Sequence, residues 1–237
     1  LKAKVISYGI KPDNDLAAKD IKFDISQTEF RLKGLGKEIN LKTKLIGRHN
    51  LYNILAAIAF GLKEGLDISL IKSALEKFEL VPGRLERINS EIGFSVFIDY
   101  AHTPDALKNV ITALRQVALG RIIVVFGCGG ERDKLKRPKM GKVVCELADY
   151  AIITNDNPRS EDPQSIINDI KIGIKPDNYC VITDRLSAIK KSLSLAVSND
   201  IVLIAGKGHE NYQVLKDKII DFNDCQAVKE CLELMKY

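Results

Sequence analysis

The sequence predicts an α/β protein whose larger part is a mostly parallel, doubly wound sheet. From about residue 83 onward, short apolar runs alternate with longer segments in which apolar residues recur at helical spacing. Repeated strand-helix units of this kind form a parallel sheet with right-handed crossovers. Before that point, segments of alternating apolar and polar residues are separated by turn sequences, as in strands with one face toward water.

Composition sets further bounds on the function. The net charge of +5 is spread along 237 residues, so it suggests small anionic ligands at most and gives no case for nucleic acid. The five Cys form no C-x-x-C pair and the three His are scattered, which argues against a disulfide framework or a zinc site and fits a reducing cytoplasm. No apolar run approaches the length of a membrane span. The chain begins with Leu1 inside a strand-like segment, so we expect a piece of a longer protein.

Residues 1–82 are expected to form a first region of strands followed by helices. The strands are expected at residues 3–8, 21–25, 29–32 and 39–43. A first helix is expected at residues 54–60, ending near Gly61 or Gly65, and a second at residues 68–78. The sequence Val81-Pro82-Gly83-Arg84 then interrupts the pattern, and we place a domain boundary near residue 82.

In the second region, strands and helices alternate. The expected strands are residues 94–99, 121–126, 150–154, 179–183 and 200–205, and the expected helices are residues 104–117, 138–147, 164–172, 185–197 and 226–235. The first of these helices has Thr103 as its N-cap and Pro104 at its first position. A hairpin is expected at residues 212–222, turning about Lys216-Asp217.

Four polar loops follow the predicted parallel strands and should meet at the edge of the sheet where open α/β sheets bind ligands. They comprise residues 99–104, 127–133, 156–159 and 206–210. Two of these loops are rich in glycine, which lets a backbone approach a ligand closely and offer its N–H groups to anions. The glycines concerned are Gly127, Gly129, Gly130, Gly206 and Gly208.

Charged side chains in these loops suit a small zwitterion. The loop Asp156-Asn157-Pro158-Arg159 combines a carboxylate, an amide and a guanidinium on a backbone stiffened by Pro158. Arg132 and Arg159 can each clamp a carboxylate with two parallel hydrogen bonds, and Glu210 can hold an ammonium. Either arginine alone is better explained by a surface ion pair, whereas the set favours a binding site.

Other motifs are incomplete or ambiguous. Arg132 stands where the dinucleotide motif G-x-G-x-x-G needs its last glycine, and none of the three Gly-Lys pairs is followed by Ser or Thr as in a Walker A loop. A nicotinamide-dependent oxidoreductase is therefore a remote alternative. The context of His102 leaves a nucleotide contact and a structural role equally open.

Several of these segments, in one order along essentially the whole chain, resemble the Mur ligases. These ATP-dependent, amide-forming enzymes build the stem peptide of peptidoglycan. The segments comprise residues 47–53, 82–86, 99–104, 126–134, 156–159 and 206–210. Within the family, the loop Asp156-Asn157-Pro158-Arg159 looks like the signature of members that add meso-diaminopimelate, because members that add L-lysine differ there.

The resemblance implies a domain assignment and a reaction. Residues 1–82 would be the C-terminal part of a central ATP-binding domain, and residues 83–237 a Rossmann-like, amino-acid-binding C-terminal domain. ATP and Mg²⁺ would activate the D-glutamate carboxylate of UDP-MurNAc-L-Ala-D-Glu as an acyl phosphate, which the amine of meso-diaminopimelate would attack. A monomeric cytoplasmic enzyme is implied, acting on small molecules without a nucleic-acid or membrane partner.

The resemblance also assigns site residues. The expected meso-diaminopimelate contacts are Arg132, Asp156, Asn157, Pro158, Arg159, Gly206 and Glu210. The expected ATP contacts are His49, Asn50, Asn53, Arg84, Asp99, Tyr100 and His102. The family's phosphate-binding loop, carbamylated lysine and UDP-sugar domain lie upstream of these residues. We therefore expect no catalytic residue, no metal ligand and no ligase activity in this chain by itself.

Three alternatives stay open at this point. A lysine-adding member of the family would be indifferent to a second carboxylate, so replacing Arg159 would have little effect. Folylpolyglutamate synthetase is a further related possibility. A stand-alone binding module for an amino acid or nucleotide would gain nothing from the missing upstream segment.

Overall fold

The computed structural model describes residues 5–88 and 92–235, and the chain divides into two compact units between Leu80 and Val81. The division falls next to residue 82, where the sequence pattern changes. Each unit has its own hydrophobic core and is described by itself.

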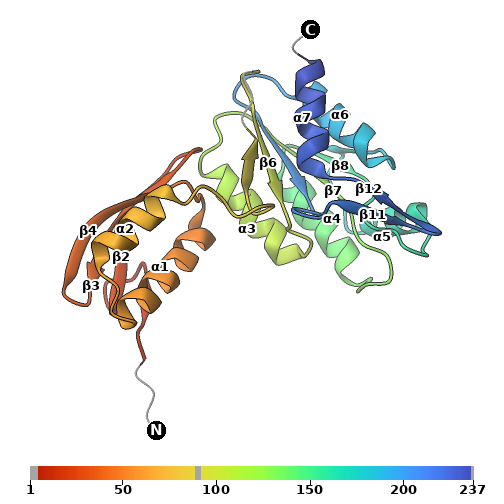
Figure 1. The fold of residues 1–237 in the computed structure, drawn as a ribbon. Coiled ribbons are helices and arrows are strands. Elements are labelled where there is room, and N and C mark those ends of the chain that lie inside the picture. Colours follow the sequence, from red (N-terminus) through yellow and green to blue (C-terminus); the bar gives the residue numbers. More distant parts are fainter. Residues whose placement is uncertain (1–4, 89–91, 236–237) are drawn as a thin grey trace. The chain divides into compact units, whose positions relative to one another are not determined.

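The first unit packs two helices against a four-stranded sheet (Figure 1). The strands, adjacent in chain order, are β1 (Tyr8–Gly9), β2 (Leu16–Phe23), β3 (Thr28–Gly34) and β4 (Lys37–Thr43), and the helices are α1 (Arg48–Lys63) and α2 (Ile68–Lys77). β1 pairs with β2 in parallel, whereas the other pairs are antiparallel. Phe30 and Leu32 alternate along β3, so both point to the core face and meet buried residues of α1 such as Leu55.

The expected elements of this unit are present with shifted limits. The predicted strand at residues 3–8 lies partly outside the described residues, and within them only Tyr8 is in a strand. β2 begins five residues before the predicted start, because Leu16, Ala17 and Ala18 are buried as part of the core despite the weak strand preference of alanine. α1 begins at Arg48 rather than residue 54, since buried Leu51 already anchors its polar first turn.

The second unit contains a six-stranded sheet in the order β5-β6-β10-β7-β8-β9. Its strands are β5 (Glu86–Ile88), β6 (Ser95–Asp99), β7 (Ile122–Phe126), β8 (Tyr150–Ile153), β9 (Tyr179–Val181) and β10 (Ile201–Ala205). Only β5 pairs antiparallel, with β6, so the predicted mostly parallel sheet is confirmed. In the register, Leu203 of β10 lies between Phe97 of β6 and Val124 of β7.

Helices cover both faces of this sheet (Figure 1). α6 (Arg185–Leu195) and α7 (Asp224–Leu234) pack on the face formed by Val96, Ile123 and Val202. Residues of opposite parity point to the other face, which α3 (Pro104–Arg115), α4 (Lys136–Leu147) and α5 (Pro163–Lys171) cover. Because both faces are covered, the central strands are apolar at nearly every position, as in β7 with Ile-Ile-Val-Val-Phe.

Two local features of this unit differ from expectation, and the predicted hairpin is present. β5 was not anticipated, because three residues at an edge give too short a pattern to detect. α4 begins two residues before Pro138, which the first turn of a helix tolerates. The predicted hairpin is present as β11 (Tyr212–Leu215) and β12 (Lys218–Asp221). Among the described residues, no helix combines the length and apolarity needed to cross a membrane.

Candidate amino-acid-binding pocket

Loops after β6, β7, β8 and β10 enclose a pocket of about 260 Å³ at the carboxyl edge of the parallel strands. β10 lies between β6 and β7, and the helix that follows it, α7, covers the opposite face from α3 and α4, so the chain leaves this edge toward both faces, as it does where open α/β sheets bind ligands. The pocket is lined by expected amino-acid contacts and two expected ATP contacts, namely Arg132, Asp156, Asn157, Arg159, Gly206, Glu210, Tyr100 and His102. It is completed by Gly127, Cys128, Gly129, Lys136 and Tyr212.

The loop after β8 is held in one conformation by hydrogen bonds to its neighbours. Arg159 has a left-handed φ of 52° and donates from its backbone N–H to the carbonyl of Val214 (3.1 Å). Its Nη1 donates to the carbonyl of Gly130 (2.7 Å), which ties the guanidinium to the loop after β7. The backbone N–H of Gly130 donates to the carbonyl of Asn157 (2.9 Å), so the two loops are joined in both directions.

Pro158 does not line the pocket, in contrast to its expected role as a ligand contact. It is buried, and its carbonyl accepts the backbone N–H of Glu161 (3.1 Å). The same carbonyl would lie 1.9 Å from a Cβ at Gly130, so only glycine allows the two loops to pack this closely. Pro158 therefore shapes the loop that carries Asp156 and Arg159.

A buried lysine links two pocket side chains. The Nζ of Lys207, whose side chain is 0% exposed, donates to Oε2 of Glu210 (2.9 Å) and to Oδ1 of Asn157 (3.1 Å). Burial acts to raise the pKa of Glu210, but hydrogen bonds from Lys207 and Asn157 outweigh it and lower that pKa. Glu210 is consequently ionised at neutral pH. Sequence reasoning missed Lys207, because a lysine between two glycines resembles an ordinary solvated loop residue.

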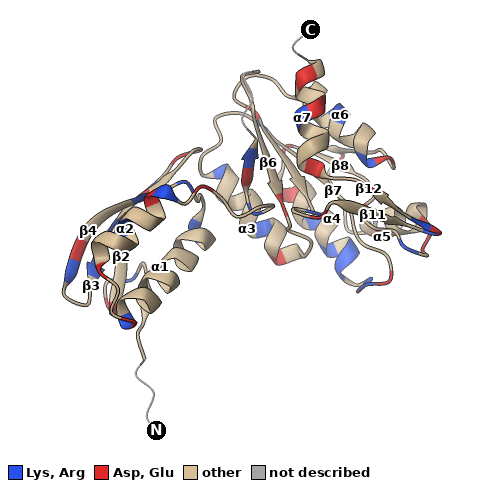
Figure 2. Ribbon diagram, viewed as in Figure 1, with Lys and Arg blue, Asp and Glu red and all other residues tan. Residues whose placement is uncertain are grey.

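Positive charge gathers on the opposite wall, and Figure 2 shows Lys and Arg on α4 and the loop before it. Arg132 is exposed at the pocket, and Lys136 donates from Nζ to the carbonyl of His102 (2.9 Å). Cys128 lines the same pocket in a buried position, and burial raises the pKa of its thiol to about 12. The thiol is therefore protonated at neutral pH and contributes a small apolar surface.

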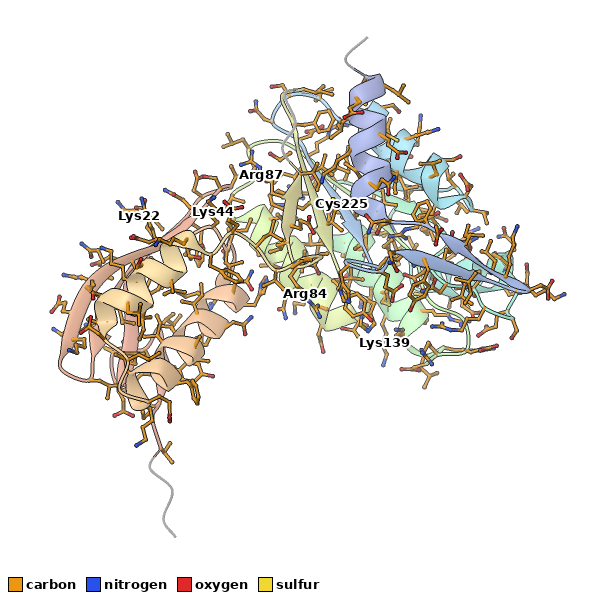
Figure 3. The ribbon with its side chains drawn as sticks, in the orientation of Figure 1. Lys22, Lys44, Arg84, Arg87, Lys139 and Cys225 are labelled. Atoms are coloured by element: carbon orange, nitrogen blue, oxygen red, sulfur yellow. The ribbon has the colours of Figure 1, made fainter. Side chains whose placement is uncertain are left out.

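The expected ATP contacts of this unit fall into two groups. Arg84, labelled in Figure 3, places its guanidinium 4.9 Å from the ring centroid of Tyr100, which also contacts the rings of His102 and His209. Asp99 is only 3% exposed, and its carboxylate accepts the backbone N–H groups of Leu85 (2.7 Å) and Ala101 (2.7 Å). Asp99 thus positions the segments around Arg84 and Tyr100 rather than presenting a free carboxylate.

The remaining expected ATP contacts lie at the start of α1 in the first unit. Asn50 is buried and donates from Nδ2 to the carbonyl of Ile46 (2.9 Å). Asn53 is exposed one helical turn later, and His49 is half-buried. Asn53 is therefore the most accessible of the three.

Two fully buried arginines support the pocket from outside its lining. Arg185 pairs with Asp224 and donates to the carbonyls of Asn155 and Ala205, at 3.1 Å each. These carbonyls directly precede the loops that carry Asp156 and Gly206. Arg137 pairs with Glu161 and Asp169 and donates to the carbonyl of Gly129 (3.3 Å). Sequence reasoning missed both, since an arginine at the start of a helix normally indicates a solvated position.

Within the described residues, no group of three or more His, Cys, Asp and Glu side chains is arranged to hold a metal ion. The five cysteines are free thiols. The pocket itself combines three cationic side chains with two carboxylates: Arg132, Lys136 and Arg159 against Asp156 and Glu210. Its chemistry therefore suits a small ligand that carries both carboxylate and ammonium groups.

Comparison with known proteins gives two family matches. Residues 83–208 match the model described as "Mur ligase, glutamate ligase domain", and residues 1–61 match "Mur ligase middle domain". Two similar proteins bear the name UDP-N-acetylmuramoyl-L-alanyl-D-glutamate--2,6-diaminopimelate ligase. The protein from Syntrophomonas wolfei is 46% identical over 95% of this chain and 47% of its own length. The protein from Halalkalibacterium halodurans is 44% identical over 96% and 48%, respectively.

Solved structures show the same relationship. A structure of a UDP-N-acetylmuramoyl-L-alanyl-D-glutamate--2,6-diaminopimelate ligase aligns with a TM-score of 0.73 and 34% identity, over 99% of this chain and 48% of that one. A MurF ligase from Thermotoga maritima in complex with ADP aligns with a TM-score of 0.68 over 97% of this chain and 48% of that one, but at 19% identity it supports the fold alone. The chain thus spans about half the length of these relatives.

Proposed function

The chain belongs to the Mur ligase family, and from this premise we propose that it provides the amino-acid-binding part of an ATP-dependent ligase that adds meso-diaminopimelate to UDP-MurNAc-L-Ala-D-Glu. Its similarity to proteins named as diaminopimelate ligases supports the proposal. The observation that carries it is the pocket at the carboxyl edge of the parallel strands, whose lining includes Arg159, Asp156, Asn157 and Glu210.

The charges of the pocket fit a diamino dicarboxylic acid better than lysine. A cavity of about 260 Å³ suits one ligand of amino-acid size. Only Nη1 of Arg159 donates hydrogen bonds to the protein, since its Nε and Nη2 donate to no group among the described residues. Those two N–H groups form the edge of the guanidinium that binds a carboxylate with two parallel hydrogen bonds. A ligand that ends in an ammonium alone would leave this edge unpaired.

The remaining side chains receive complementary roles in the proposal. Arg132 binds a second carboxylate or the charge that develops during the reaction. Glu210 and Asp156 accept hydrogen bonds from ammonium groups, and the backbone of Gly206 closes the pocket beside Asp156. Pro158 supports the loop from below. Together these contacts hold the attacking amine of meso-diaminopimelate in a fixed orientation, and orientation can supply roughly 7–11 kcal/mol of a barrier between two reactants.

The expected ATP contacts divide into residues that would touch the nucleotide and residues that position them. In the second unit, the exposed guanidinium of Arg84 over Tyr100, with His102 alongside, fits the phosphate or sugar of a nucleotide. In the first unit, the exposed amide of Asn53 fits a nucleotide base. Asp99 positions the segments around Arg84 and Tyr100 through backbone contacts. Asn50, which bonds the carbonyl of Ile46, and its neighbour His49 precede Asn53 on α1. ATP supplies the phosphoryl group that converts the acceptor carboxylate to an acyl phosphate. Mg²⁺ belongs to the proposal as the companion of the ATP phosphates, and no residue of this chain is assigned to hold it.

The domain assignment follows the same premise. We place residues 1–82 in the C-terminal part of a central ATP-binding domain and residues 83–237 in the amino-acid-binding domain. The free thiols support a reducing compartment, and a monomer in the cytoplasm acting on small molecules is the simplest arrangement.

Calorimetric titration of the chain with meso-diaminopimelate, LL-diaminopimelate and L-lysine tests the proposal. We expect selective binding of the meso isomer. Replacement of Arg159 by alanine should weaken it at least about tenfold, because a charge-assisted pair contributes about 1.5–3 kcal/mol. Arg115→Ala, which removes a guanidinium outside the pocket, should leave the affinity unchanged. Binding of L-lysine as tightly as the meso isomer would overturn the assignment in favour of a lysine-adding ligase.

A further inference from the structure

We propose that Lys207 is a positioning residue that determines which atoms of Asn157 and Glu210 face the ligand, and so makes the pocket selective for an ammonium and a carboxylate on neighbouring atoms. This inference rests on the proposed function and deepens it, because it names a determinant of substrate choice outside the pocket lining. Nothing in the loop sequence distinguishes Lys207 from the solvated lysines of the chain.

Lys207 acts from beneath the pocket. Its side chain is 0% exposed, and it is absent from the pocket lining, whereas Gly206, Glu210 and Tyr212 around it are present. Its Nζ also lies 5.5 Å from the ring centroid of Tyr212, which lines the cavity. Lys207 therefore influences a ligand only through the side chains to which it donates.

The amide of Asn157 has one permitted orientation. Its Oδ1 accepts hydrogen bonds from Nζ of Lys207 (3.1 Å) and from the backbone N–H of Val214 (2.9 Å), while its Nδ2 donates to Oε2 of Glu210 (2.9 Å). A flipped amide would place its NH₂ against two donors and its oxygen against a carboxylate. Both acceptor positions of Oδ1 are occupied, so Asn157 has only one N–H left for a ligand. Asn157 can therefore bind a carboxylate but not an ammonium.

The two oxygens of the Glu210 carboxylate also differ in their partners. Oε2 accepts from both Lys207 and Asn157, whereas Oε1 accepts no hydrogen bond among the described residues. Oε1 is therefore the atom available to a ligand ammonium. An N–H donor from Asn157 and an acceptor from Glu210 thus stand side by side, with the free edge of Arg159 in the same pocket. This arrangement matches the neighbouring ammonium and carboxylate of an amino-acid centre, and lysine lacks the second such centre.

The charge of Glu210 depends on Lys207 more than on any other side chain. Arg159 on the loop after β8 also favours the ionised form, and Arg185 at the start of α6 lies within electrostatic range of Glu210. The other charged or titratable groups that line the same pocket are Tyr100, His102, Cys128, Arg132, Lys136, Asp156 and Tyr212. Without Lys207, burial would no longer be offset by its nearest cation, and the pKa of Glu210 should rise above the ordinary value of a carboxyl group.

Two variants separate the charge of Lys207 from its hydrogen bonds. Lys207→Met removes both and preserves the volume of the side chain, whereas Lys207→Gln retains a donor without the charge. The carboxyl carbon of Glu210 is titrated by NMR in the unliganded chain, and circular dichroism checks that each variant is folded. We expect a pKa below the ordinary value in the natural chain, above it in Lys207→Met, and in between for Lys207→Gln. Lys191→Met, at an exposed position of α6, should leave the titration unchanged.

Ligand binding supplies the second measurement. At pH 7.5, Lys207→Met should bind meso-diaminopimelate at least about tenfold more weakly, and its affinity should fall further as the pH is lowered toward the raised pKa of Glu210. The natural chain should show little such dependence above pH 5.5, and Lys207→Gln should lie closer to the natural chain.

The two proposals fail in different ways. If the natural chain binds no diamino acid, the proposed function is wrong, while the titration of Glu210 still decides the role of Lys207. If the pKa of Glu210 is the same in the natural chain and in the folded variants, the inference about Lys207 is wrong even when meso-diaminopimelate binds. Should Lys207→Met not fold, a pKa of Glu210 at or above the ordinary value in the natural chain, or unaltered in Lys207→Gln, overturns it equally.

Discussion

Two fully buried arginines support the pocket, and they differ in how far their partners are shielded from water. Arg185 beneath the pocket pairs with Asp224, and both side chains are 0% exposed. Arg137 beside the loop after β7 pairs with Glu161 and Asp169, which are 18% and 38% exposed. Arg185 uses Nε, Nη1 and Nη2 in hydrogen bonds, whereas the Nε of Arg137 is among the few buried polar atoms of the described residues without a partner.

The difference indicates two kinds of support for one site. The pair of Arg185 and Asp224 joins α6, α7 and the strand ends before two pocket loops, so its loss should affect the whole unit. The pair of Arg137 and Glu161 joins α4 to the loop that begins α5, and its carboxylate is accessible to protons and salt. We therefore expect the pair of Arg185 and Asp224 to determine the stability of the second unit. The pair of Arg137 and Glu161 should make the stability of the loops beside the pocket depend on pH.

The largest effect should come from Asp224→Asn, which leaves Arg185 charged and poorly paired in a buried site. Removing one partner of a buried ion pair costs about 3–5 kcal/mol of unfolding free energy. The matched control is Glu146→Gln, which breaks the exposed pair of Lys142 and Glu146 on α4 and should cost about 0.3–0.5 kcal/mol. Urea unfolding measures both variants.

A second comparison distinguishes an unpaired charge from lost packing. In the double variant Arg185→Met/Asp224→Leu no charge is left unpaired, so it should be more stable than Asp224→Asn alone. A cost below about 1 kcal/mol for Asp224→Asn would mean that the buried pair does not support the unit in the way its burial indicates.

Glu161→Gln should have a smaller effect at neutral pH and a larger one on the pH profile. Hydrogen bonds from Arg137 and then from the backbone of Glu131 lower the pKa of Glu161 from 4.5 to about 2. Since the folded state has the lower pKa, this stabilisation is complete above about pH 4.5 and is lost as the pH falls through 2. At pH 7 the substitution should cost about 1.5–3 kcal/mol, the usual contribution of charge-assisted hydrogen bonds.

Urea unfolding at several pH values between 7 and 2 checks this prediction. The natural chain should lose stability between pH 4.5 and 2, and Glu161→Gln should lose less over the same interval. Glu146→Gln serves as the control with an unaltered profile. Parallel profiles for the natural chain and Glu161→Gln would show that protonation of Glu161 does not cause the loss of stability at low pH.

The arrangement of the site was readable from sequence where it depends on local pattern. Apolar runs placed the central strands, and polar residues after them placed the four loops that form the pocket. Strand order was not readable, because the position of β10 between β6 and β7 depends on pairings between residues about 80 to 105 apart, such as Leu203 with Val124 and Phe97. The order decides which loops meet, so the pocket could be anticipated only from the assumption of a parallel sheet.

Buried charge was the part of the site that sequence patterns could not reveal. Arg185 is buried because Asp224, 39 residues later, lies opposite it, and no pattern within either helix records that pairing. Lys207 is buried because Asn157 and Glu210 meet it from two different loops. Asp99 is a further case, since the family resemblance implied an ATP contact but no sequence pattern showed that its carboxylate accepts two backbone N–H groups.

The smallest expected effect comes from a second cation on the same carboxylate. Nζ of Lys134 lies 3.4 Å from Oε2 of Glu161, but the lysine side chain is 66% exposed, whereas Arg137 is 0% exposed. Lys134→Ala should therefore cost at most about 0.5 kcal/mol, and this cost should vanish in 1 M salt, where screening acts over about 3 Å. Urea unfolding at low and high salt measures it. A cost as large as that of Glu161→Gln would mean that the charge of these partners, rather than the burial of Arg137, determines how much Glu161 contributes to stability.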